Sequence, residues 1–236
     1  TNGNALAGVP LAQALYEAGQ LEQAERLLVI YIPLIRGVGI PDELIIAHVV
    51  MARIQVERGE DDRAEQLMLE LERIGHREGL PRVVASARLE RVRILVMHDK
   101  LARARSELDR CGDRALWSRV ARLSHRANEV ESHDVALARW SVRTGHAAEV
   151  IPTLRAELDS AERNQRERRA LTLRLLLAQA LHRDGQRNKS MRLLARAIVA
   201  AAHEGYVRAV LDEGPLMLSM LGELRAPPDL LADEAS

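Results

Sequence analysis

The chain has 236 residues, of which 34 are basic and 34 acidic, so its formal net charge at pH 7 is zero. A balanced charge gives no net field that would draw the protein to nucleic acid or anionic lipid, which argues against non-specific DNA binding. Hydrophobic residues make up 47% of the chain, charged residues 29% and aromatic residues only 2%, with no Phe. Leu, Ala, Arg and Glu dominate, and these strong helix formers predict an all-α protein with a large buried core.

The cysteine count and the N-terminal sequence indicate the compartment. Cys111 is the only cysteine, which excludes an internal disulfide and any zinc site built on two thiolates, and fits a reducing, cytoplasmic location. No stretch approaches the roughly 18 apolar residues that a membrane-spanning helix needs, so no membrane association is expected. The sequence begins TNGN, without Met or a signal-peptide core, and we therefore expect an excised piece of a longer protein.

Turn residues recur along the chain at a nearly constant interval. Helix-length runs such as 43–58 and 168–183 carry apolar residues at three- and four-residue intervals, and Gly or Pro separates the runs. The recurring turn residues are Gly19, Gly59, Asp99, Gly145 and Gly185, spaced 40, 40, 46 and 40 residues apart. Because Gly tolerates the positive φ that ends a helix before a tight turn, each of these positions predicts the turn of a helix hairpin.

Small and apolar residues stand at fixed distances from these turns. Seven residues before them lie Ala12, Ala52, Val92, Ala138 and Ala178. Five residues after them lie Ala24, Ala64, Ala104, Val150 and Ser190, and nine residues after them lie Leu28, Met68, Leu108, Leu154 and Leu194. Small residues at minus seven and plus five let two helix axes approach closely, while the residue at plus nine fills the space toward the next hairpin.

This spacing is similar to that of the tetratricopeptide hairpin. We therefore predict an all-α, tetratricopeptide-like helix-hairpin solenoid over residues 1–224, a right-handed superhelix of about five hairpins with no β-strand. The six-residue surplus between the third and fourth turns falls in residues 112–133. Residues 225–236, with a Pro pair and an acidic end, are predicted to begin an interdomain linker.

Four segments look more specific than the generic repeat. They are residues 8–17 (GVPLAQALYE), 79–82 (GLPR), 204–208 (EGYVR) and 211–217 (LDEGPLM). Together they resemble the helical-repeat region of the large bacterial LuxR-family, MalT-like transcription activators. That resemblance implies a three-part regulator with an ATPase module, a helical-repeat sensor and a DNA-binding helix-turn-helix, of which this chain is the sensor. The chain contains no G-x-x-x-x-G-K-[ST] phosphate loop, as expected for the sensor part rather than the ATPase module.

One set of polar residues shares a position on the first helix of each predicted hairpin. Six residues before the turns lie Gln13, Arg53, Arg93, Arg139 and Gln179, which we call the inner ladder, and Tyr16 lies three residues before the first turn. In the tetratricopeptide register these positions are exposed on the inner face, so we expect them to bind a small-molecule effector or a partner protein. The alternative is that the arginines pair across the hairpins with Glu17, Glu57, Glu90 or other neighbouring acids.

No constellation of residues indicates an enzyme or a metalloprotein. The eight histidines form no H-E-x-x-H or i, i+4 pair, and no Cys-His or Ser-His-Asp motif is present. We expect no cofactor, and interpret Cys111, Trp117 and Trp140 as packing residues. Two functions stay open. The first is a sensor and oligomerisation module that contacts other domains of the same regulator and does not itself bind DNA. The second is a passive tetratricopeptide adaptor. The sequence does not decide whether copies form a homo-oligomer.

Overall fold

The computed structural model describes residues 2–36, 40–121, 127 and 131–224, and within them every regular element is an α-helix. The helices group into two compact units, Thr1–Thr144 and Gly145–Ser236. The sequence analysis did not predict this division, since it treated residues 1–224 as one repeat domain. The expected linker at 225–236 lies outside the described residues.

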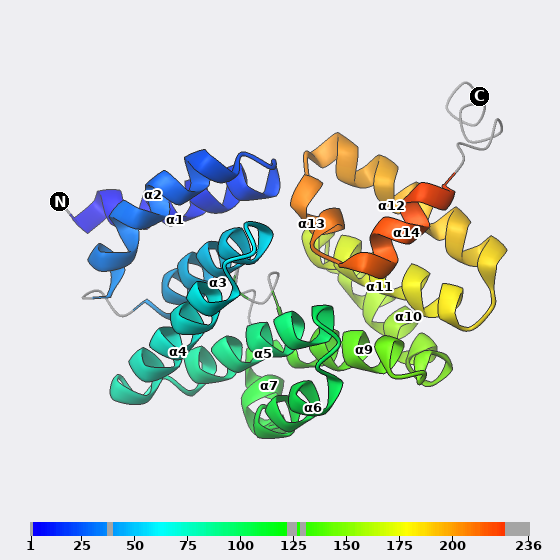
Figure 1. Ribbon diagram of the computed structural model, residues 1–236, viewed down its shortest axis with the longest axis horizontal. Helices are drawn as coiled ribbons and strands as arrows, with labels where there is room; N and C mark the ends of the chain where they lie inside the picture. The colour runs from blue at the N-terminus through cyan, green and yellow to red at the C-terminus, as the bar shows by residue number, and fades with distance from the viewer. Residues whose placement is uncertain (1, 37–39, 122–126, 128–130, 225–236) are drawn as a thin grey trace. The chain divides into compact units, whose positions relative to one another are not determined.

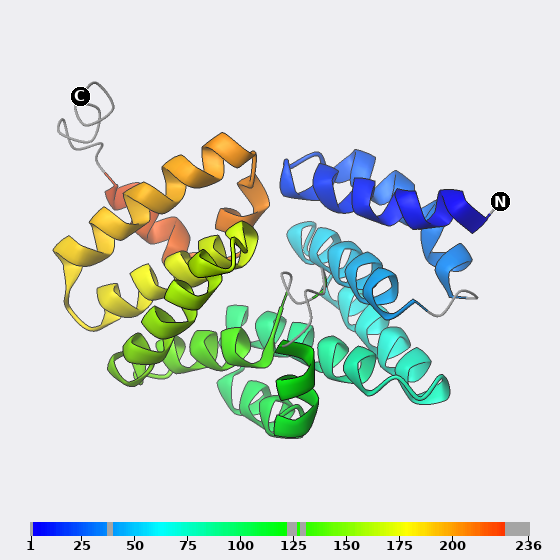
Figure 2. The ribbon, with the colours of Figure 1, turned by 180° about the vertical axis from the view of Figure 1, so that it is seen from behind.

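Within its described residues, the first unit consists of consecutive helix hairpins followed by the shorter helices α7 and α9 (Figure 1). Its helices are α1 (Asn2–Glu17), α2 (Leu21–Ile35), α3 (Pro41–Glu57), α4 (Asp61–Arg77), α5 (Pro81–Met97), α6 (Leu101–Arg110), α7 (Arg114–Ala121) and α9 (His133–Arg143). α1 packs on α2, α3 on α4, and α5 on α6, and each pair also contacts the pair or helix that follows it. The view from behind shows the same pairing (Figure 2).

The second unit continues the pattern of neighbouring antiparallel helices. Its helices are α10 (Ala147–Arg163), α11 (Glu167–Arg183), α12 (Arg187–Glu204), α13 (Val207–Leu211) and α14 (Pro215–Glu223). α11 packs between α10 and α12, and the two short helices α13 and α14 also contact α11. Its core joins Leu175 and Ala178 of α11 to Leu194 and Ala197 of α12 and to Met217 of α14.

The backbone turns at all five of the predicted positions. The φ angles at the five turn residues are positive, from 59° at Asp99 to 87° at Gly145, and a helix ends shortly before each of them. Gly59 shows why glycine is favoured there, since its φ of 75° is strained for an L side chain although nothing lies within 4 Å of the place of a Cβ. The sequence analysis missed Gln165, which has a φ of 53° in the turn between α10 and α11.

The residues predicted at close helix crossings lie in the interior. Every residue at minus seven, plus five and plus nine is buried, with the exception of Val150, which is half-buried. The extra residues between the third and fourth turns include α7, whose Leu116 and Val120 pack on Ala85 of α5. Trp117 donates its indole hydrogen to the carbonyl oxygen of Cys111 at 2.7 Å, so this part of the insertion is held against the end of α6.

Candidate functional site

The inner-ladder arginines of the first unit lie in the interior as ion pairs. Arg53 of α3 donates two hydrogen bonds to Glu90 of α5, from Nε to Oε1 at 3.0 Å and from Nη2 to Oε2 at 2.8 Å. Arg93, one turn further along α5, donates from Nε to the same Oε1 at 2.6 Å. Arg53 is 4% exposed, Arg93 2% and Glu90 0%, so one carboxylate joins two buried guanidinium groups from adjacent hairpins.

A second buried ion pair lies beside this one. Arg139 of α9 donates a hydrogen bond to Glu131, whose other oxygen accepts a hydrogen bond from the backbone N–H of Ser132 at 3.1 Å. Nearby in sequence, Ala127 is also buried and belongs to the same apolar cluster as Ala87 of α5. Glu131, which belongs to the insertion, is therefore the partner of the buried inner-ladder residue Arg139.

The two carboxylates of this cluster respond differently to burial. Burial opposes the charged form of Glu90, but the charges and hydrogen bonds of Arg53 and Arg93 outweigh it and hold the pKa of Glu90 below its usual value. For Glu131, burial and the like charge of Glu90 raise the pKa despite the opposing effect of Arg139. The pKa values of the two buried carboxylates are therefore shifted in opposite directions, that of Glu90 downward and that of Glu131 upward.

Four of the five inner-ladder residues are thus buried, although the sequence analysis expected all five to be exposed. Tyr16 is 1% exposed and Gln179 5%, while Gln13 is half-buried. Gln179 belongs to the second unit, where its amide donates to Glu213 at 3.4 Å. The pairing of Arg53 and Arg93 with Glu90 agrees with the alternative that the sequence analysis left open. Contact between the ladder and an effector stays a prediction.

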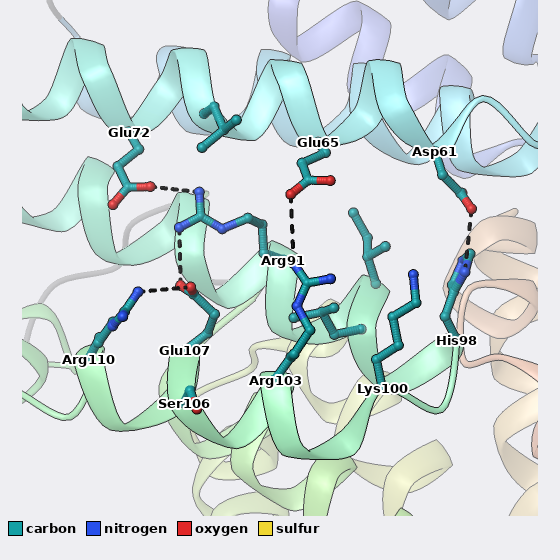
Figure 3. A pocket seen from close by; sticks show the side chains of 13 residues that line it. Asp61, Glu65, Glu72, Arg91, His98, Lys100, Arg103, Ser106, Glu107 and Arg110 are labelled. Atoms are coloured by element: carbon teal, nitrogen blue, oxygen red, sulfur yellow. Dashed lines mark hydrogen bonds and ion pairs between the residues drawn. The ribbon is translucent and has the colours of Figure 1, made fainter.

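A groove lies instead on the first unit between α4 and α6, above α5 (Figure 3). Its volume is about 470 Å³, which is in the size range of small-molecule sites. α4 contributes mainly carboxylates to one wall, and Ile94 and Leu95 of α5 form an apolar floor. The other wall consists of α6 and the residue before it, and its lining residues are Lys100, Arg103, Ser106, Glu107 and Arg110. We call this the α4–α6 groove.

One end of the α4–α6 groove is closed by ion pairs. Arg91 of α5 lies 2.6 Å from Glu72 of α4 and 3.1 Å from Glu107 of α6, nitrogen to oxygen, so it links both walls. Arg88 and Arg110 add further contacts to Glu72 and Glu107, at 2.7 and 3.3 Å. Burial opposes ionisation of Glu72, yet its two arginine partners keep its pKa below the usual value.

The other end of the groove is more open and more loosely paired. Arg103 and Glu65 face each other across the walls at 4.0 Å, and both side chains are more than half exposed. His98 lies 3.4 Å from Asp61, nitrogen to oxygen. Figure 3 shows the amine of Lys100 directed into the groove on the α6 side. Separated charges of both signs above an apolar floor are complementary to a polar ligand.

The sequence analysis did not find this groove. It considered the first helices of the hairpins, whereas the two walls come from second helices, α4 and α6. The sequence does carry a sign of the groove in the charges at equivalent positions of the 40-residue register. His98 occupies the position equivalent to Arg58, and Lys100 occupies the position equivalent to Glu60.

Neither a metal centre nor a membrane span is visible in the described parts of the chain. No three His, Cys, Asp or Glu side chains gather there in a way that could hold an ion. None of the helices in those parts combines the length and hydrophobicity needed to cross a bilayer.

The fold defines the class of protein as an all-α solenoid of tetratricopeptide-like hairpins. This chain is similar to the crystal structure of a single-substitution form of a Podosopora anserina protein, described as a kinesin light chain with nearly identical TPR-like repeats. The TM-score is 0.51 and the identity 18%, over 86% of this chain and 96% of that one. A second structure of that protein gives a TM-score of 0.49, also at 18% identity, over 86% of this chain and 97% of that one. At this identity the likeness establishes the fold alone.

The family is more specific than the fold. The family model of the MalT-like TPR region matches residues 4–227, which is nearly the whole chain, and the chain belongs to this family. This confirms the resemblance to MalT-like repeat regions that segments such as 204–208 suggested. The comparison with curated proteins gave no match.

Proposed function

We propose that the chain is the sensor and assembly module of a bacterial, cytoplasmic, MalT-like regulator of the LuxR family. A small effector or a partner protein would bind the repeats and change how they contact the ATPase and DNA-binding parts of the same regulator. The observation that carries the proposal is the family match over residues 4–227, because the solenoid fold alone is shared with repeat proteins of many functions.

Ligand binding controls such a module only if the ligand has different affinities for two states of the repeats. The buried cluster around Glu90 is one place where two states could differ, since it joins Arg53 of one hairpin to Arg93 of the next. If an effector uses the inner ladder, its acceptor groups must take over from Glu90 or Glu131 as partners of these arginines. This requirement favours an anionic or strongly polar effector at that face.

The second candidate is a passive adaptor that holds peptide segments and transmits no signal. It is favoured by the fold, because TPR-like repeats generally mediate protein–protein interaction. An adaptor needs a docking surface but no coupling to nucleotide or DNA.

The experiment begins with the coding sequence on both sides of the 236 codons. A phosphate loop upstream and a helix-turn-helix downstream are expected for the regulator. In the complete gene product, deletion of residues 4–227 should then leave DNA binding by the C-terminal part intact and abolish inducible transcription of a reporter. Induction that survives the deletion, or a gene that encodes neither domain, would contradict the regulator and leave the adaptor.

A further inference from the structure

The lining positions of the α4–α6 groove have register equivalents one hairpin earlier, on α2 and at the end of α3, which we call the earlier groove, and the ion pairs at the two sets of positions differ. Glu25 of α2 occupies the register position of Glu65, and Arg58 that of His98. Arg58 reaches Glu25 with two contacts of 2.7 Å, and Gln55 donates a third at 3.2 Å. The carboxylate on the wall of the earlier groove is therefore held by the chain itself.

In the α4–α6 groove the described side chains form no equivalent interaction. His98 is shorter than Arg58 and lies beside Asp61, at 3.4 Å, so that Glu65 is left with the 4.0 Å contact to Arg103. Asp61 itself stands where the earlier groove has Leu21, and Lys100 stands where it has Glu60. Asp61 and Lys100 thereby add one carboxylate and one cation to Glu65 and Arg103. The register counterparts of Glu65 and Arg103 one hairpin earlier are Glu25 and Arg63, which carry the same charges.

The charges at this end are separated by sign and accessible to solvent. Asp61 is 45% exposed, Glu65 56% and Arg103 67%. Exposed ion pairs at such distances contribute little to stability, so a ligand that displaces them loses little binding free energy in doing so. Between the walls, Ile94 and Leu95 of α5 and Leu69 of α4 offer apolar surface. The complementary ligand has an ammonium group, a carboxylate and an apolar body.

We propose that the open end of the α4–α6 groove binds a small zwitterion of the free amino acid or dipeptide class. The ammonium group would lie against Asp61 and Glu65, the carboxylate against Lys100 and Arg103, and an aliphatic side chain over the apolar floor. A dipeptide is well within the volume of about 470 Å³. The inference does not depend on the proposed regulatory role, because it concerns binding to the chain alone.

The first experiment is titration calorimetry of the 236-residue chain with L-leucine and leucyl-leucine. Binding of at least one is expected, while leucine amide, which lacks the carboxylate, and N-acetyl-leucine, which lacks the ammonium group, should each bind at least about tenfold more weakly. Absence of binding by both zwitterions would overturn the proposal. Binding of either blocked analogue with the affinity of the parent zwitterion would overturn it too, as would binding only of long peptides.

The second experiment locates the site with variants at exposed positions, which are expected to fold. His98→Arg restores the side chain of the earlier groove, so the introduced guanidinium should pair with Glu65 and weaken binding at least about tenfold. Lys100→Gln should do the same by removing a partner of the carboxylate. Matched controls are His203→Arg and Lys189→Gln on α12 in the second unit, which should leave affinity unchanged. Wild-type affinity in both groove variants would place the ligand elsewhere and reject this site.

Discussion

The hydroxyl of Ser190 donates a hydrogen bond to the carbonyl oxygen of Ala178 at 2.7 Å, and both residues are fully buried. Ser190 stands five residues after the turn at Gly185 and Ala178 seven residues before it. The contact is possible only because both side chains are short, so it shows directly why the repeat keeps small residues at these two positions.

The same crossing in the third hairpin predicts a cost of overpacking. Ala104 of α6 is fully buried in the cluster that contains Val92 of α5. Ala104→Leu should lower the free energy of unfolding by about 1–3 kcal/mol, because a larger side chain separates the two helices. Ala102→Leu is the matched control, since Ala102 is exposed on the same helix, and its effect should stay within about 0.5 kcal/mol. Equal urea midpoints for the two variants would contradict the crossing.

The buried ion pairs predict a strong asymmetry between two carboxylates. Glu90→Gln keeps the shape of the side chain but removes the negative charge that Arg53 and Arg93 share, and should destabilise the protein by about 3–5 kcal/mol. Glu149→Gln changes a carboxylate that is 75% exposed beside His146, and its cost should be about 0–1 kcal/mol. Chemical denaturation of both variants measures the difference, and a Glu90→Gln variant as stable as the wild type would show that the buried charges are not coupled.

His48 predicts a pH dependence of stability. Its side chain is fully buried on α3, with Nδ1 2.7 Å from the carbonyl oxygen of Leu44. Burial lowers the pKa of His48 below 6.5, and the charge of Arg36 adds a smaller effect in the same direction. The hydrogen bond to Leu44 and the charge of Glu70 raise the pKa, but they do not outweigh burial. The unfolded chain therefore takes up this proton first, and stability should decrease as the pH falls below about 6.5.

The test compares urea unfolding of the wild type and of His48→Leu between about pH 7.5 and pH 5, on either side of the unperturbed histidine pKa. The variant should lose less stability over this interval, while His203→Gln, at a side chain that is 83% exposed, should follow the wild type. Identical pH profiles for the wild type and His48→Leu would exclude His48 as the source of the dependence.

Cys111 should be chemically inert in the folded protein. Burial raises the pKa of its thiol to about 12, and the sulfur contacts the carbonyl oxygen of Glu107 at 3.1 Å. Since the thiolate is the reactive form, a disulfide reagent at about pH 8 should modify the native chain slowly and the chain in guanidinium rapidly. Fast modification of the native protein would show that the thiol is accessible.

The isolated chain should neither hydrolyse ATP nor bind DNA in a sequence-dependent manner. It has no phosphate loop, and its net charge of zero supplies no general attraction to phosphates. An ATPase assay and a gel shift at moderate salt test this directly. Turnover above background, or a shift that depends on sequence, would require a site of a kind that neither the sequence nor the α4–α6 groove suggests.

The hairpin turns and crossings could be predicted from the sequence because they depend on local chemistry. A left-handed turn needs Gly or a tolerant residue such as Asp99, and a close crossing needs Ala or Ser, so these residues recur whenever the local structure recurs. The positive φ of Gln165 was not predicted because its turn joins two hairpins and contains no glycine that would indicate it.

Burial of the inner ladder could not be predicted in the same way. The partner of Arg139 is Glu131, which belongs to the insertion that departs from the 40-residue register. Glu90 is within the register and was one of the acids that the sequence offered as partners, but the repeat pattern did not decide between Glu90 and the other acids or between pairing and exposure. Exposure depends on which residues lie opposite in space, and periodicity alone does not contain that information.

The arrangement of the helices also determines how the chain can fold. Most helices pack on those that directly precede and follow them in sequence, so a hairpin such as α3 and α4 can form before distant segments meet. Nucleation is then possible in several hairpins, with growth to neighbours in either direction. The bond between Arg53 and Glu90 spans 37 residues and needs both of its hairpins in place. Charge neutralisation in the interior is therefore a late event, and mutations there should mainly accelerate unfolding rather than slow the first steps of folding.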